Sequence, residues 1–123
     1  MDEPVSVVIP TYNRSGLVGR AIASVAAAIS AGDEIVVVDD GSTDGTAEVV
    51  ARQRGAVRYI QAPHRGVSAA RNRGIREARN PLVAFLDSDD TWEPDKLTLQ
   101  RSVMSAFSDV VFCFSTFRLT TKT

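Results

Sequence analysis

The chain has 123 residues, which suits a single domain with one core and is short for an enzyme that must hold two substrates. Hydrophobic residues make up 44% of it and charged residues 24%, and the formal net charge is -1. This balance gives no general attraction to nucleic acid or to anionic membranes, so nucleic acid is not expected as a partner and any phosphate site must be local.

The cysteine count and the first residues of the chain bear on whether the protein has disulfides, a secretion signal or a membrane span. Cys113 is the only cysteine, so neither an intramolecular disulfide nor a multi-cysteine metal site can form, and we expect it to be a core thiol. The first residues lack the features of a signal peptide, and no apolar run reaches the length of about 20 residues that a membrane span needs. We expect a cytoplasmic location, with peripheral membrane attachment left open for a full-length protein.

Two kinds of apolar segment alternate along the chain. Short runs of β-branched and other apolar residues are typical of strands buried on both faces. They cover residues 5–9, 34–38, 57–61, 82–86 and 110–114. Segments with apolar residues at helical spacing cover residues 17–29, 44–53, 67–78 and 94–103. This alternation predicts an α/β fold, with a Rossmann-like, mostly parallel sheet, flanking helices and right-handed crossovers.

A few residues are informative about these predicted helices. Gly32 would cap the first helix, and Ser42 or Thr43 would cap the second. Pro94 suits the first position of the last helix. In the third helix Arg71 falls on the apolar stripe, where a solvated charge is not expected, so we expect it to face inward.

Polar loops follow three of the predicted strands. They are Thr11-Tyr12-Asn13 after the first strand, Asp39-Asp40-Gly41 after the second and Asp87-Ser88-Asp89-Asp90 after the fourth. Ligands of such sheets bind beyond the carboxyl ends of the strands, so these loops should converge on one crevice. Taken alone, the acidic loop is compatible with a solvated turn, because Asp and Ser favour turns, or with a cation site, because clustered carboxylates repel one another.

The residue types in these loops favour a nucleoside diphosphate. The loop after the first strand lacks the Gly-x-Gly-x-x-Gly pattern of dinucleotide sites, and the chain has no Walker-type loop. An acid after the second strand can accept hydrogen bonds from a sugar hydroxyl or a base N–H. Acids after the fourth strand, with Arg71 facing inward, can hold a divalent ion that substrate phosphates complete, as is usual for Mg²⁺.

Four motifs, in order, resemble those of a known family. They are Val8-Ile9-Pro10-Thr11-Tyr12-Asn13, Val37-Val38-Asp39-Asp40-Gly41-Ser42-Thr43-Asp44, Gly66-Val67-Ser68-Ala69-Ala70-Arg71-Asn72 and Phe85-Leu86-Asp87-Ser88-Asp89-Asp90 with Trp92-x-Pro94-x-x-Leu97 after it. Together they resemble the N-terminal half of family-2 glycosyltransferases with the GT-A fold. The resemblance covers the chain up to about Leu97.

The resemblance implies a site for a nucleoside-diphosphate sugar, most often a UDP-sugar. Pro10, Thr11 and Tyr12 would line the pocket for the base and ribose. Asp40 would contact the base, and Asp39 would orient the same loop.

The resemblance also implies a metal-dependent transferase. Asp87 and Asp89 match the DXD motif, with Asp87 toward the ribose, Asp89 as the ligand of Mn²⁺ or Mg²⁺, and Asp90 as a third acid. Arg71 would lie over the nucleotide. The cation would stabilise the departing diphosphate during inverting transfer to an acceptor hydroxyl, a reaction of cell wall or polysaccharide biosynthesis.

The family's catalytic base and acceptor-binding region usually lie beyond these motifs. We therefore expect residues 1–123 to be a truncated donor-binding domain that lacks the acceptor-binding half, with the base outside the chain and little transfer activity of its own. The sugar stays open, as does the acceptor, whether saccharide, lipid or protein. A sheet cut from its second half could also self-associate through an apolar patch.

Two alternatives come from other classes. One is a non-catalytic module that binds a nucleotide-sugar. The other is a phospho-receiver domain, which fits poorly because its acidic pair would follow the first strand, where Thr11 and Tyr12 stand, and because Lys122 lies too far on for the expected lysine.

The remaining singular side chains have simpler interpretations. We expect His64 to be a solvent-exposed loop residue, Trp92 to pack at a helix start and Asp44 to lie at a helix N-terminus. The other arginines around the third helix would form a solvated face; they are Arg65, Arg73, Arg76 and Arg79.

Overall fold

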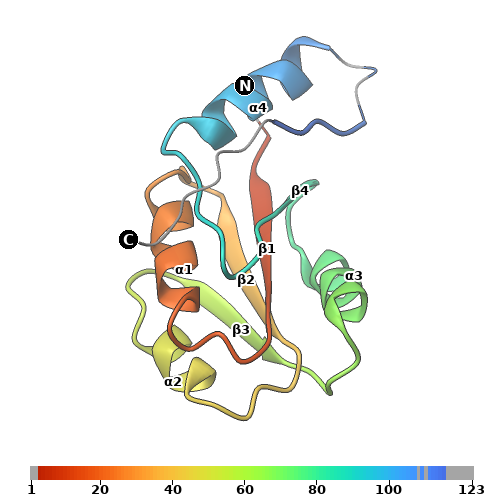
Figure 1. The fold of residues 1–123 in the computed structure, drawn as a ribbon. Coiled ribbons are helices and arrows are strands. Elements are labelled where there is room, and N and C mark those ends of the chain that lie inside the picture. Colours follow the sequence, from red (N-terminus) through yellow and green to blue (C-terminus); the bar gives the residue numbers. More distant parts are fainter. Residues whose placement is uncertain (1–2, 108, 110, 116–123) are drawn as a thin grey trace.

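The computed structural model describes residues 3–107, 109 and 111–115, which form four strands and four helices in strict alternation (Figure 1). The strands are β1 (Val5–Thr11), β2 (Glu34–Asp39), β3 (Val57–Gln61) and β4 (Leu82–Phe85). The helices are α1 (Val18–Ala26), α2 (Thr46–Ala51), α3 (Val67–Glu77) and α4 (Lys96–Ala106). The predicted α/β class is confirmed.

All four strands are parallel and lie in the order β3-β2-β1-β4. The chain moves outward from β1 through β2 to β3 and then returns to place β4 on the other side of β1. The strand order therefore reverses beside β1. At the carboxyl edge of a parallel sheet, this reversal opens the crevice in which ligands bind.

The central strand β1 contributes to two cores, because successive side chains of a strand point to opposite faces. Val7 and Ile9 pack with Ile22 of α1 on one face, and Val8 packs with Ala70 of α3 on the other. Figure 1 shows α1 and α2 on one side of the sheet and α3 on the other. Both faces of the sheet are covered, as the uninterrupted apolar strands predict.

Helix α3 approaches the sheet closely because it has a glycine at the contact. A Cβ added at Gly74 would lie 2.3 Å from Cγ1 of Val8. No side chain fits in that space without moving the helix. The close approach brings the start of α3 to the carboxyl edge of β1.

A buried ion pair ties α4 to the sheet. Asp33, just before β2, lies 2.7 Å from Nη2 of Arg101, and the two side chains are 0% and 8% exposed. Asp33 also accepts hydrogen bonds from the backbone N–H groups of Val5 and Ser30, each at 2.8 Å. Burial raises the pKa of Asp33, but the bonds from Arg101, Ser30 and Val5 outweigh burial and hold that pKa below its ordinary value of 3.8.

Two predicted helix caps are wrong. Helix α1 already ends at Ala26, and Gly32 instead occupies the turn before β2, with a φ of 93° that favours glycine. At the start of α2, the side chain of Asp44 accepts a 3.0 Å hydrogen bond from the N–H of Thr46, so neither Ser42 nor Thr43 caps this helix. The prediction that Asp44 lies at a helix N-terminus is confirmed.

The fifth predicted strand is wrong for the residues that the structure describes. Residues 111–115 pair with no strand, and Val110 lies outside the described residues. Val111 and Phe114 are 85% and 83% exposed, and Cys113 is half-buried rather than in the core. An apolar run with β propensity forms a strand where a neighbouring strand pairs with it and other residues cover one of its faces. Residues 111–115 have no pairing strand, and their large apolar side chains are exposed.

Among the described residues, no helix combines the length and the apolar character required to cross a bilayer.

Candidate functional site: a polar hollow at the carboxyl edge of the sheet

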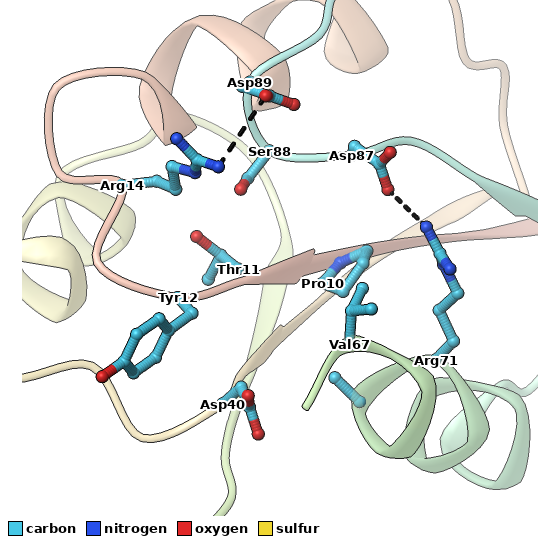
Figure 2. Close-up of a pocket in the computed structure, with 11 residues that line it drawn as sticks. Pro10, Thr11, Tyr12, Arg14, Asp40, Val67, Arg71, Asp87, Ser88 and Asp89 are labelled. Atoms are coloured by element: carbon cyan, nitrogen blue, oxygen red, sulfur yellow. Dashed lines mark hydrogen bonds and ion pairs between the residues drawn. The ribbon is translucent and has the colours of Figure 1, made fainter. Parts of the chain in front are cut away.

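A hollow of about 310 Å³ opens where the loops after β1, β2 and β4 meet the start of α3 (Figure 2). Six of the seven residues predicted to bind the donor line it, and the predicted metal ligand Asp89 does too. The full lining consists of Pro10, Thr11, Tyr12, Arg14, Asp40, Val67, Ala70, Arg71, Asp87, Ser88 and Asp89. The predicted convergence of three loops on one crevice is thus observed, and Asp39 is the one predicted residue outside the lining.

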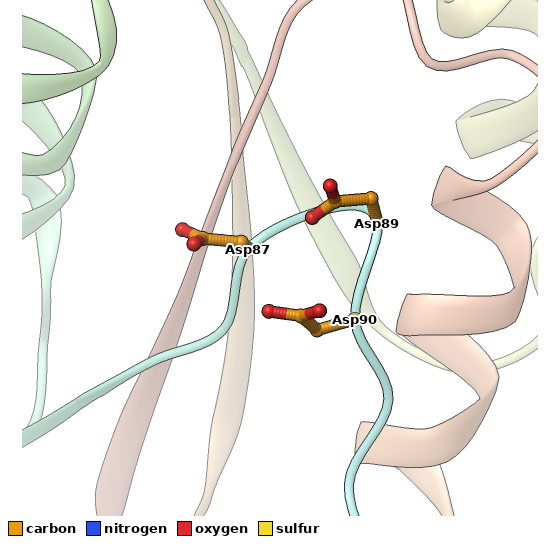
Figure 3. A group of neighbouring side chains, drawn as sticks. All are labelled: Asp87, Asp89 and Asp90. Carbon is orange, nitrogen blue, oxygen red and sulfur yellow. The ribbon is translucent and has the colours of Figure 1, made fainter. Parts of the chain in front are cut away.

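The acidic loop after β4 places three carboxylates together (Figure 3). Oxygen atoms of Asp87, Asp89 and Asp90 all lie within 4.8 Å of one another, and all three residues are exposed. Partial desolvation raises the pKa of Asp90, and the neighbouring charges of Asp89 and Asp87 raise it further. The backbone positions the group, since Leu86 donates to the carbonyl of Val8 at 3.1 Å.

This cluster fits a hard divalent cation. Carboxylate oxygens are the ligands that Mg²⁺ and Mn²⁺ favour, and few protein ligands are needed where a substrate completes the coordination. The three carboxylates lie close enough to repel one another, and a cation between them would relieve this repulsion.

Two arginines face these acids across the hollow. Nη2 of Arg71 lies 2.8 Å from Oδ1 of Asp87, which is consistent with the inward orientation expected from the sequence. Nη2 of Arg14 lies 3.8 Å from Oδ2 of Asp89. Sequence reasoning missed Arg14, although its place in the loop after the first strand was a usable signal.

The two acids after β2 have different surroundings. Asp39 is 1% exposed, and its carboxylate accepts hydrogen bonds from the hydroxyl of Tyr59 and, at 2.8 Å, from the N–H of Ser42. Partial burial and the bond to Asp39 raise the pKa of Tyr59. Asp39 therefore holds the loop that contains Asp40 rather than facing the hollow.

Asp40 lines the hollow and also fixes the loop after β3. Its carboxylate accepts hydrogen bonds from the N–H groups of Arg65 at 2.7 Å and Gly66 at 3.0 Å. Nδ1 of His64 lies 2.9 Å from Oδ2 of Asp40. The carboxylate of Asp40 therefore already has hydrogen-bond partners within the protein, while the residue also lines the hollow.

His64 does not line the hollow but contacts two residues that do, Tyr12 and Asp40, which the sequence did not indicate. Its side chain is 56% exposed, as expected, yet its ring stacks on Tyr12 with centroids 4.1 Å apart. Gly41 permits the contact, because a Cβ there would lie 2.9 Å from the backbone N of His64. The position of His64 in a loop at the carboxyl edge was the available signal.

Other sequence-based interpretations of single residues can be compared with the structure. Trp92 is 8% exposed and belongs to the core cluster, so the packing role is confirmed. Arg73 pairs with Glu77 at 3.2 Å on the half-exposed side of α3. Within the described part of the chain, Oγ1 of Thr11 is a buried side-chain oxygen with no hydrogen-bond partner, and Thr11 lines the hollow.

The fold and the hollow define a class of protein: a parallel α/β domain that can bind a charged ligand at the switch point of its sheet. The chain belongs to the glycosyl transferase family 2, whose family model matches residues 6–121. This agrees with the family suggested by the four motifs.

One relative is an uncharacterized glycosyltransferase of Rickettsia felis, 41% identical over 105 residues. The match covers 84% of this chain and 17% of that relative, so the chain spans about a sixth of the length of the relative.

Two solved structures extend the comparison. Staphylococcus aureus TarS 1-349 in complex with UDP matches with a TM-score of 0.76 and 30% identity, over 83% of this chain and 32% of that one. The mannosyltransferase PcManGT from Pyrobaculum calidifontis, in complex with GDP-Man and Mn²⁺, matches with a TM-score of 0.75 and 29% identity, over 84% of this chain and 32% of that one. The predicted GT-A architecture is confirmed by these structures.

Proposed function

We propose that residues 1–123 are the donor-binding domain of an inverting, cytoplasmic glycosyltransferase that uses a UDP-sugar and Mn²⁺ or Mg²⁺. The observation that carries this proposal is the convergence of a carboxylate cluster, two arginines and an aromatic side chain on one hollow at the switch point of the sheet. Similar proteins were solved with UDP and with GDP-Man and Mn²⁺, which supports a nucleotide-sugar as the ligand.

We assign the base and ribose to the end of the hollow formed by the loop after β1. Pro10 and Thr11 would form its wall, and Tyr12 would offer one ring face to the base while His64 covers the other. Asp40 would accept a hydrogen bond from the base in addition to those from its own loop.

We assign the diphosphate and the cation to the other end of the hollow. Asp89 would be the metal ligand, Asp87 would point from this end toward the ribose, and Arg71 would lie over the nucleotide. When bound, the cation supplies Lewis-acid stabilisation of the charge that develops on the departing diphosphate. These residues fix the donor so that its leaving group lies against positive charge.

In the proposed transfer, an acceptor hydroxyl attacks the anomeric carbon while the bond from that carbon to the diphosphate oxygen breaks. A carboxylate base takes the proton of the attacking hydroxyl, and the configuration at the anomeric carbon is inverted. We assign this base to no described residue.

Calorimetry tests the proposal. We expect UDP to bind in the presence of Mn²⁺. In Asp89→Asn we expect UDP binding to weaken by more than about tenfold, because mutating even a residue that only holds a metal ligand in place lowers metal affinity by that factor. Glu3→Gln, an exposed charge outside the hollow, is the control and should bind like the wild type. A folded wild type that binds no UDP with Mn²⁺ present would refute the proposal.

A further inference from the structure

Asp87 and Asp89, which we assign to the diphosphate and cation end of the hollow, are each paired with an arginine in the structure. Arg71 lies against Asp87, and Arg14 lies against Asp89 (Figure 2). All four side chains line the same hollow. Within these two pairs the formal charges cancel, but Asp40 in the same lining and Asp90 beside Asp87 and Asp89 leave the site with an excess of negative charge.

This excess of negative charge has a consequence for two charged ligands. The site attracts a divalent cation, and without a cation it repels the two negative charges of a nucleoside-diphosphate sugar. A bound cation offsets the acids and attracts the diphosphate. Binding of one ligand should therefore favour binding of the other, and the coupling is reciprocal.

The pair between Arg14 and Asp89 is suited to being exchanged. Its N–O distance is 3.8 Å, and the side chains are 48% and 46% exposed. Exposed ion pairs of this kind contribute little to stability, so a divalent ion can displace the arginine at small cost.

The backbone of Arg14 is fixed, while its side chain is not tied down in the same way. The N–H of Arg14 donates to Oγ1 of Thr46 at 3.1 Å, and its carbonyl accepts from Leu17 and Val18 at 2.9 Å and 2.8 Å. The side chain therefore extends into the hollow from a backbone that is held on both sides. Its planar array of donors matches phosphate oxygens in two places at once.

A second polar group lies in the same wall. Thr11 is 3% exposed, its Oγ1 lacks a hydrogen-bond partner within the described chain, and it lines the same hollow as Arg14 (Figure 2). A buried hydroxyl without a partner is costly unless a ligand or water satisfies it. Its location marks this wall as one that faces a polar ligand.

We infer that Arg14 binds the diphosphate of the donor, and that it does so after a divalent cation has replaced it on Asp89. The inference rests on the proposed function and adds a residue that neither the motifs nor the matched proteins assign. Arg14 thereby couples cation binding to donor binding through one exchangeable ion pair.

The test uses three variants and two titrations. The variants are Arg14→Gln, Arg14→Lys and the control Arg52→Gln, which removes an exposed arginine at the end of α2, outside the hollow. Mn²⁺ alone is titrated by calorimetry, and UDP is then titrated at saturating Mn²⁺. Melting temperatures confirm that each variant is folded.

We expect Arg14→Gln to bind Mn²⁺ at least as tightly as the wild type, because the competing cation is gone. We expect the same variant to bind UDP about tenfold more weakly at saturating Mn²⁺, because a charge-assisted bond to phosphate is lost. Arg14→Lys should recover part of the UDP affinity, and Arg52→Gln should match the wild type in both titrations.

Two results would overturn the inference: unchanged UDP affinity in Arg14→Gln, or equal losses for Mn²⁺ and UDP, which would indicate a structural role. If the wild type itself fails to bind UDP with Mn²⁺, the proposed function fails as well. If the wild type binds and Arg14→Gln binds identically, only the role of Arg14 fails.

Discussion

Asp39 and Asp40 are adjacent acids with separate tasks. Successive side chains at a strand end point in opposite directions, so one acid enters the protein and the other faces the hollow. Asp39 bonds Tyr59 and Ser42, and Asp40 bonds the backbone of the loop after β3. At the scale of single residues, the site therefore depends on acids that build its loops as well as on acids that can touch a ligand.

The residue prediction concerns His64, whose ring covers one face of Tyr12. In His64→Ala we expect UDP affinity at saturating Mn²⁺ to fall by about 1 kcal/mol, which is the scale of an aromatic pair. His64→Phe keeps a ring on Tyr12 and should retain more affinity than His64→Ala. Calorimetry measures both, and equal affinity in the wild type and His64→Ala would contradict a supporting role for this ring.

At the scale of elements, the placement of α3 and α4 depends on contacts that no local pattern reveals. Helix α3 lies against β1 through Gly74, and α4 is held by the pair between Asp33 and Arg101, which are 68 residues apart. The first contact sets the distance between α3 and β1, and the second joins α4 to the start of β2 and, through the N–H of Val5, to the start of β1.

The prediction for α3 compares two glycines. Gly74→Ala should lower the free energy of unfolding by about 1–3 kcal/mol, because the new methyl group overpacks the contact with Val8. Gly16→Ala is the matched control, since a Cβ at Gly16 meets no atom within 4 Å. Urea unfolding measures both, and similar stabilities for the two variants would show that α3 is not held at this distance.

The prediction for α4 concerns pH. The pKa of Asp33 is lowered in the folded state, so its contribution to stability is present above its ordinary value of 3.8 and is lost as the pH falls below that value. We expect Asp33→Asn to be less stable than the wild type at pH 7, by about 3 kcal/mol, because Arg101 loses a buried charged partner.

The two proteins should then keep a constant difference in stability from pH 7 down to about 4, and approach each other as the pH falls below 3.8. Urea unfolding above and below this pH measures the difference, with Glu93→Gln as an exposed-acid control. A stability difference between wild type and Asp33→Asn that stays constant below pH 3.8 as well would show that the charge of Asp33 does not link α4 to the sheet.

At the scale of the whole molecule, periodicity in the sequence predicts the four strands and four helices, and the polar loops predict the edge at which they meet. The order β3-β2-β1-β4 was not predicted, because it depends on which strands pair across the fold. Arg14 and His64 were missed for the same reason, since each gains its role from a loop far away in sequence. The strand expected at residues 110–114 failed because propensity alone cannot supply a pairing neighbour.

The central claim is that the hollow between the loops after β1, β2 and β4 binds a nucleoside diphosphate together with a cation. A crystal structure of this chain with UDP and Mn²⁺ tests it most directly. We expect an anomalous manganese peak against Asp89, the diphosphate within reach of Arg14 and Arg71, and the base against Tyr12. UDP bound elsewhere on the chain, or manganese away from the carboxylates that follow β4, would contradict it.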